Sequence, residues 1–310
     1  MGRRAIERLQ AAARHFPGDL LAALEVRLSS NSGDVDLSVR LLHPSPAVAN
    51  LVPPPLQQLL LQTGDSSPVS SLWLELDLDD RTSRELPVPL LAAGLRGDAD
   101  AGWVADSLLP ALHGSPLGAA QRRLVLRCLN GIPAPGKLLY VFSLSSRGEG
   151  AVRLEISGLE PASILDYLEA QAPHTVGPVS EVAPLFEGVE RIHLSFDIGE
   201  EVSPRIGIEG SFLRLPYREP RWAELFERLV ERGLCLPAKR DAALAWPGYD
   251  SLRTAPDRWP AGAGPRNVCV RSLSHVKVVS RPDREPEAKV YLLVTPLVRP
   301  PARRQPQDLA

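Results

Sequence analysis

Five predicted β-hairpins constrain the possible folds of this chain more than any other feature. Helical sequence precedes each hairpin, so helix and hairpin alternate along the chain. Ten antiparallel strands of this kind are enough to close into a barrel that leaves no exposed sheet edge. The predicted hairpins are Leu24–Leu42, Leu72–Leu91, Leu138–Leu159, Arg191–Leu213 and Arg271–Leu297.

Apolar and polar side chains alternate along the strands of these hairpins. From Arg191 to Ile198 every second residue is apolar, and the return strand from Arg205 to Phe212 alternates in the same way. Because successive side chains of a strand point to opposite faces, each strand has one apolar and one polar face. If helices cover the apolar face from outside, the polar face lines the inside of the barrel.

We therefore predict an α+β fold in which five αββ repeats form a closed ten-stranded antiparallel β-barrel with helices outside, as a single domain over residues 1–298. An open antiparallel sheet with helices is the alternative. Residues 299–310 are rich in Pro, Arg and Gln, and we expect a disordered tail there. Helices are expected at residues 6–16, 53–62, 103–112, 117–129, 161–170, 220–232 and 237–246, with a loop over residues 249–267.

The composition points away from nucleic acids and membranes as partners. The 310-residue chain has a formal net charge of −2, so it offers no excess of positive charge to either surface. It contains no run of 18 apolar residues and no early apolar stretch of signal-peptide type, and we expect a cytoplasmic protein. Its oligomeric state stays open. Cys128, Cys235 and Cys269 lack metal-binding spacing and are expected to be reduced thiols.

The alternation places many charged and aromatic side chains on the polar face. A basic residue recurs on the return strand of four hairpins, at Arg40, Arg153, Arg205 and Lys289, and Lys277 lies in the last hairpin. Several cations in a cavity of low dielectric constant repel one another unless an anion sits among them, and a diphosphate suits such a place. Alternatively, these residues are only the solvated side of a sheet. The same face is predicted to carry Glu25, Trp73, His193, Asp197, Glu209, His275 and Tyr291.

The repeat number, hairpin spacing and polar inner face resemble those of the ABBA (αββα) prenyltransferases over about residues 6–297. That family includes dimethylallyltryptophan-synthase-type enzymes and the prenyltransferases of cyanobactin peptide pathways. Its members bind an allylic diphosphate through Arg and Lys side chains and shield the carbocation with tyrosines. The resemblance implies that Glu25 is the catalytic residue that takes the substrate proton, and that Tyr291 and Trp73 form the prenyl pocket. It assigns the diphosphate to Arg153, Arg205, Lys277 and Lys289.

The implied function is transfer of an isoprenoid from an allylic diphosphate to an aromatic or peptide side-chain acceptor in natural-product biosynthesis. No metal site is expected, because no carboxylate cage is evident, although Mg²⁺ could assist the diphosphate. The main competing hypothesis is a non-catalytic barrel that binds a small molecule or peptide, or an accessory protein in a peptide-modification pathway. A structural protein and an acid–base enzyme using His193, Asp197 or His275 also stay open. The sequence lacks the motifs of serine hydrolases, P-loop enzymes and dinucleotide-binding enzymes.

Overall fold

The computed structural model describes most of the chain between residues 3 and 297. The described ranges are 3–16, 20–31, 33–41, 52–63, 68–78, 88–145, 150–213, 219–251 and 268–297. The predicted disordered tail, 299–310, lies outside them, as does most of the predicted loop at 249–267. Among the described residues, no helix is long and apolar enough to span a membrane.

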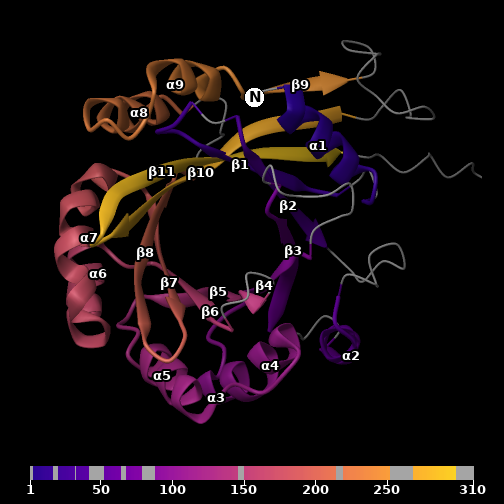
Figure 1. Cartoon of the computed structure of the whole chain (residues 1–310), viewed down its shortest axis with the longest axis vertical. Helices are drawn as coiled ribbons and strands as arrows, with labels where there is room; N and C mark the ends of the chain where they lie inside the picture. The colour runs from indigo at the N-terminus through magenta and orange to yellow at the C-terminus, as the bar shows by residue number, and fades with distance from the viewer. Residues whose placement is uncertain are drawn as a thin grey trace, which may run out of the picture.

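Ten strands close into a barrel, in which each strand is antiparallel to both of its neighbours (Figure 1). Closure comes from β11, which pairs with β10 on one side and with β1 on the other. The predicted barrel is therefore confirmed, and the open-sheet alternative is wrong. The barrel strands, in order around the ring, are β1 (Ala22–Arg27), β2 (Val35–Leu41), β3 (Val69–Leu76), β4 (Leu90–Leu95), β5 (Lys137–Ser143), β6 (Val152–Ser157), β7 (Arg191–Ile198), β8 (Val202–Ser211), β10 (Val268–Arg281) and β11 (Arg284–Leu297).

An eleventh strand, β9 (Gly248–Ser251), was not predicted. It pairs with the first four residues of β10, Val268 to Arg271, along the same edge of β10 that β8 occupies further on. At 14 residues each, β10 and β11 are the longest strands described, which leaves room for this extra pairing. The start of the region predicted as a loop is therefore a short strand.

The second hairpin was predicted with its return strand too early in the sequence. The hairpin was expected to end at Leu91, but β4 runs from Leu90 to Leu95, and it begins immediately after Pro89. A proline has no backbone N–H to donate to a neighbouring strand, so pairing starts only after it.

Helices lie outside the ring of strands (Figure 1). Each predicted helix is present, and an unpredicted one, α7 (Val176–Val182), lies between two 3₁₀ turns, Pro173–Thr175 and Ala183–Phe186. The helix predicted at residues 103–112 contains a central π-helical turn, Val104–Leu108, between α3 (Ala101–Trp103) and α4 (Leu109–His113). The others are α1 (Arg3–Ala13), α2 (Pro54–Thr63), α5 (Ala119–Asn130), α6 (Pro161–Gln171), α8 (Arg221–Glu231) and α9 (Pro237–Leu244).

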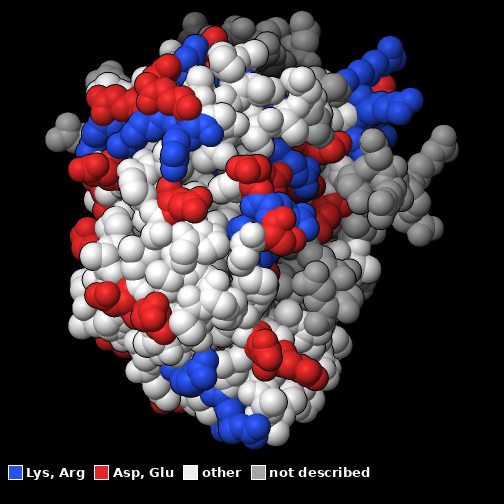
Figure 2. All heavy atoms as spheres, turned by 60° about the vertical axis from the view of Figure 1, so that its left-hand side comes forward, with Lys and Arg blue, Asp and Glu red and all other residues white. Residues whose placement is uncertain are grey.

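The main hydrophobic core lies between the strands and these helices. The apolar residues of each alternating strand face outward into it, together with helix residues such as Leu225 and Phe226. Six apolar residues on the outward faces of the barrel strands are each at most 1% exposed: Leu194, Phe196, Ile206, Ile208, Val276 and Val290. Because this face is covered, the polar residues between them face the barrel interior. On the outer face in Figure 2, side chains of both charge signs lie next to one another around uncharged areas.

Candidate active site in the barrel lumen

The barrel encloses a cavity of about 780 Å³, which reaches the end of the barrel where β6 stops and β7 begins. This volume lies within the usual range for small-molecule sites. Its wall contains both aromatic and charged side chains. The aromatic ones are Trp73, Tyr140, Phe142, Phe212 and Tyr291, and the charged ones on the barrel strands are Glu75, Arg153, Glu155, Arg191, Glu209 and Lys277.

Arg153, Asp197 and Arg205 form a buried ionic group on β6, β7 and β8. Arg153 and Asp197 are directly opposite in register, and Arg153 Nε and Nη2 donate to the two oxygens of Asp197 at 2.6 and 3.1 Å. Arg205 Nη1 reaches Asp197 Oδ2 at 3.4 Å. Burial opposes ionisation of Asp197, but the two guanidinium groups hold its pKa below the ordinary value. The arrangement is therefore a charged pair with a second arginine beside it.

Lys277 and Glu209 form a second buried pair, between β10 and β8. Lys277 Nζ donates to Glu209 Oε1 at 2.5 Å, and His275 Nε2 lies 3.3 Å from Oε2. Burial would raise the pKa of Glu209, but Lys277 and His275 lower it to about 2. The lysine reaches across Gly207, where a Cβ atom would lie 2.6 Å from Lys277 Cε. A glycine at this position therefore leaves the space that the lysine occupies.

Glu25 is the centre of a third group, with Lys289 and Tyr291 of β11. Lys289 Nζ donates to Glu25 Oε1 at 2.5 Å, and the Tyr291 hydroxyl donates to Oε2. Although burial opposes ionisation, Lys289 and Tyr291 hold the pKa of Glu25 well below its ordinary value. Tyr291 stacks on His275, with ring centroids 4.0 Å apart and an angle of 22° between the planes. This contact connects the second and third groups.

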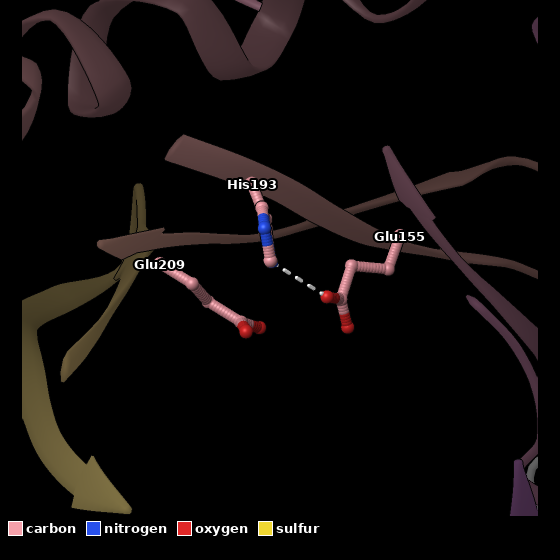
Figure 3. A group of neighbouring side chains, drawn as sticks. All are labelled: Glu155, His193 and Glu209. Carbon is pink, nitrogen blue, oxygen red and sulfur yellow. Dashed lines mark hydrogen bonds and ion pairs between the residues drawn. The ribbon is translucent and has the colours of Figure 1, made fainter. Parts of the chain in front are cut away.

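Glu155, His193 and Glu209 point toward one another from β6, β7 and β8 (Figure 3). His193 Nδ1 lies 3.0 Å from Glu155 Oε1. Burial and the nearby charge of Glu209 raise the pKa of Glu155, and Glu155 raises the pKa of His193 against the effect of burial. The two carboxylates and the imidazole therefore form one polar cluster on the cavity wall.

These three residues also have the spacing of metal ligands, because one ligand atom of each lies within 4.8 Å of the others. However, both oxygens of Glu209 already contact nitrogen atoms of β10, one of them the Lys277 ammonium. A divalent cation would have to compete with this ammonium at a distance where like charges repel strongly. The donor set therefore fits an internal ion pair rather than a metal ion.

The twelve predicted site residues all lie on the barrel strands, but only part of them line the cavity. Those that line it are Trp73, Arg153, His193, Glu209, His275, Lys277 and Tyr291. Those outside the lining are Glu25, Arg40, Asp197, Arg205 and Lys289.

The expectation that an external anion must neutralise converging lumen cations is wrong. The four cations predicted to bind diphosphate, Arg153, Arg205, Lys277 and Lys289, each contact an internal carboxylate. The reason is that acidic residues occupy matching inward positions on the neighbouring strands, so the lumen supplies its own counter-charges.

Tyr140 and Phe142 were missed as cavity residues. The stretch from Leu138 to Phe142 is continuously apolar, so alternation does not reveal which residues face inward. A register shift between Leu138 and Tyr140 in the pairing with β6 changes the alternation there. The structure shows what makes room for the ring: Gly94 lies opposite Tyr140, and a Cβ atom at Gly94 would be 2.7 Å from the tyrosine ring.

Acid should destabilise this protein through His275. Burial lowers the pKa of His275 from 6.5 to about 4; Glu209 opposes this shift, and His193 and Lys277 add to it. Between these two values the unfolded chain binds more protons, so the free energy of unfolding should fall as the pH drops from 6.5 to 4. The slope should be at most about 1.4 kcal/mol per pH unit. Urea denaturation over this range, in the wild type and in His275→Gln, measures it. Parallel curves for the two proteins would contradict the assignment.

The barrel has the architecture of the ABBA prenyltransferases, which confirms the predicted resemblance at the level of the fold. AnaPT from Neosartorya fischeri superposes with a TM-score of 0.51 at 9% identity, covering 88% of this chain and 77% of that one. The 5-dimethylallyltryptophan synthase of Streptomyces coelicolor superposes with a TM-score of 0.51 at 12% identity, covering 94% and 92%. No protein-family model and no curated protein matches the sequence.

Proposed function

We propose that this protein transfers an isoprenoid from an allylic diphosphate to an aromatic or peptide acceptor bound in the barrel lumen. The proposal rests on the cavity inside the barrel, whose wall combines cations with aromatic rings. Ionisation of an allylic diphosphate needs positive charge at the leaving group and electron-rich, dry walls around the allyl cation. The cavity wall places two cations, Arg153 and Lys277, near aromatic rings, which supports the proposal.

Arg153 and Lys277 line the cavity and are the proposed diphosphate ligands. Arg205 and Lys289 lie outside the cavity lining, and we propose that their positive charge supports diphosphate binding from there. The Arg153 guanidinium carbon lies 5.7 Å from the centroid of the Phe142 ring. An aromatic wall therefore adjoins the proposed position of the leaving group. Trp73, Tyr140 and Tyr291 extend that wall, and we propose that they enclose the prenyl chain.

The acceptor class is proposed by analogy with one solved relative in fold. The S. coelicolor protein is named a 5-dimethylallyltryptophan synthase, and an aromatic acceptor would suit the aromatic wall of this cavity. Since the cavity reaches the end of the barrel, a side chain of a peptide could enter from there. We therefore propose two acceptor types: an aromatic small molecule, or a peptide side chain in a natural-product pathway.

A second candidate function is non-catalytic binding, and the internal ion pairs favour it. A diphosphate must compete with Asp197 for Arg153 and with Glu209 for Lys277, each at a short distance. A neutral ligand or a peptide would leave these pairs intact. The two candidates differ in whether any diphosphate is released.

The test is incubation with dimethylallyl and geranyl diphosphates and a panel of aromatic and peptide acceptors, with mass spectrometry of the products and measurement of released diphosphate. Lys277→Ala should reduce turnover strongly. Lys137→Ala is the matched control, because Lys137 is an exposed lysine paired with Asp98 on the surface. Ligand binding without any diphosphate release would favour the second candidate, and turnover insensitive to Lys277→Ala would remove the assigned diphosphate site.

A further inference from the structure

Glu155 differs from three other lumen carboxylates in how its oxygens are engaged. Both oxygens of Glu25, of Asp197 and of Glu209 contact a nitrogen or hydroxyl donor. Glu155 contacts His193 through Oε1, whereas Oε2 has no hydrogen-bond or ion-pair partner among the residues that the structure describes. The side chain is buried but lines the cavity. Its second oxygen is therefore free to receive a hydrogen bond from a bound molecule.

We infer that Glu155, held in place by His193, takes the proton from the acceptor during prenyl transfer. The inference rests on the proposed function and names the residue that would complete it. His193 lies beside Glu155 on the adjacent strand and fixes one oxygen, so the other oxygen has a defined direction. Glu25 has no equivalent free oxygen and does not line the cavity. The contacts of Glu25 suit a role in positioning the side chains of Lys289 and Tyr291.

The proposed step balances without a further reactant. The C–O bond of the allylic diphosphate breaks, and its electron pair leaves with the diphosphate. The nucleophilic atom of the acceptor forms a bond to the allylic carbon and then loses its hydrogen as a proton to Glu155 Oε2. The electron pair of that bond stays on the acceptor. The proton passes to solvent after product release, which restores the carboxylate.

The electrostatic surroundings favour Glu155 as the base. Burial and the charge of Glu209 raise its pKa, while His193 and Lys277 lower it to a smaller extent. A base with a raised pKa accepts a proton more readily, whereas the low pKa of Glu25 makes that residue a weak base. The other titratable and charged groups of the barrel strands around this centre are Glu75 on β3, Tyr140 on β5, Arg153 on β6, Arg191 on β7, His275 on β10 and Tyr291 on β11.

The experiment compares Glu155→Gln, His193→Gln and Glu25→Gln with the wild type, using kcat and KM as functions of pH. For Glu155→Gln we expect kcat to fall about 100- to 10,000-fold, with a small change in KM and loss of the acidic limb of the kcat profile. His193→Gln should shift that limb. Glu25→Gln should keep the limb, because the base is still present.

Chemical rescue separates a catalytic role from a structural one. Formate should restore turnover of Glu155→Ala in a saturable way, because a small carboxylate can occupy the space of the missing side chain. Dimethylallyl thiodiphosphate binding and the melting temperature of each variant report on folding. If Glu155→Gln does not fold, Glu155→Asp keeps the carboxylate and should retain the acidic limb at reduced kcat.

The outcomes separate this inference from the function on which it rests. If the wild type turns over and Glu155→Gln keeps the acidic limb of the kcat profile unchanged, the inference alone is overturned. Loss of that limb in Glu25→Gln also overturns the inference alone. A folded Glu155→Ala variant that formate does not rescue also overturns it. A wild type that releases no diphosphate with any acceptor overturns the proposed function and the inference together.

Discussion

Replacement of Arg153 by alanine should lower the free energy of unfolding by about 3–5 kcal/mol. The Arg153 and Asp197 side chains are only 6% and 7% exposed, and two hydrogen bonds join them. Without Arg153, the hydrogen bond that the buried carboxylate of Asp197 keeps among the described residues is the one from Arg205, at 3.4 Å. A buried charge that loses its main partner is costly, because water cannot replace the lost interaction. Urea denaturation at neutral pH measures the change.

The matched control is Arg122→Ala. Arg122 makes a similar two-bond contact with Asp106, but these side chains are 43% and 47% exposed. Removing an exposed pair should have a much smaller effect on stability, because water solvates the remaining charge. The double variant Arg153→Met/Asp197→Leu should recover much of the lost stability, since it leaves no unpaired charge. Equal effects of Arg153→Ala and Arg122→Ala would show that the lumen pair is solvated.

Truncation of Trp222 to alanine should cost about 3–5 kcal/mol. Trp222 lies on α8 and is 2% exposed. It packs edge-on against Phe212 with ring centroids 4.8 Å apart, and it also contacts Phe226. The truncation would remove a large apolar side chain from the interface between α8 and the end of β8.

Tyr249→Ala serves as the control for this change, because Tyr249 is an aromatic residue that is 69% exposed. Its truncation should alter stability by no more than about 0.5 kcal/mol. Thermal and urea unfolding of both variants give the comparison. A near-neutral effect of Trp222→Ala would mean that α8 does not dock onto the barrel through this face.

The barrel could be predicted from the sequence because the pattern that indicates it lies within each short strand and hairpin. Alternation within each strand, such as Arg191 to Ile198, shows which residues share a face. The repetition of hairpins then makes closure the simplest way to protect the sheet edges. The inward residues of the alternating strands follow directly from this pattern.

The partners of the lumen charges could not be predicted in the same way. Which carboxylate meets Arg153 depends on the register between β6 and β7, which places Asp197 opposite it. That register comes from strand pairing over a distance of 44 residues, and alternation contains no such information. Tyr140 was missed for a related reason, since the irregular pairing of β5 changes the face on which the residue lies.

A crystal structure of the protein with dimethylallyl thiodiphosphate, an analogue that does not ionise readily, tests most directly whether the lumen is a prenyl-transfer site. We expect the diphosphate group to lie inside the barrel in contact with Arg153 and Lys277. These cations should loosen their contacts with Asp197 and Glu209, and the prenyl chain should lie against Tyr291. Binding of the analogue only outside the barrel, or an unaltered lumen at saturating analogue, would contradict the claim that the lumen is a prenyl-transfer site.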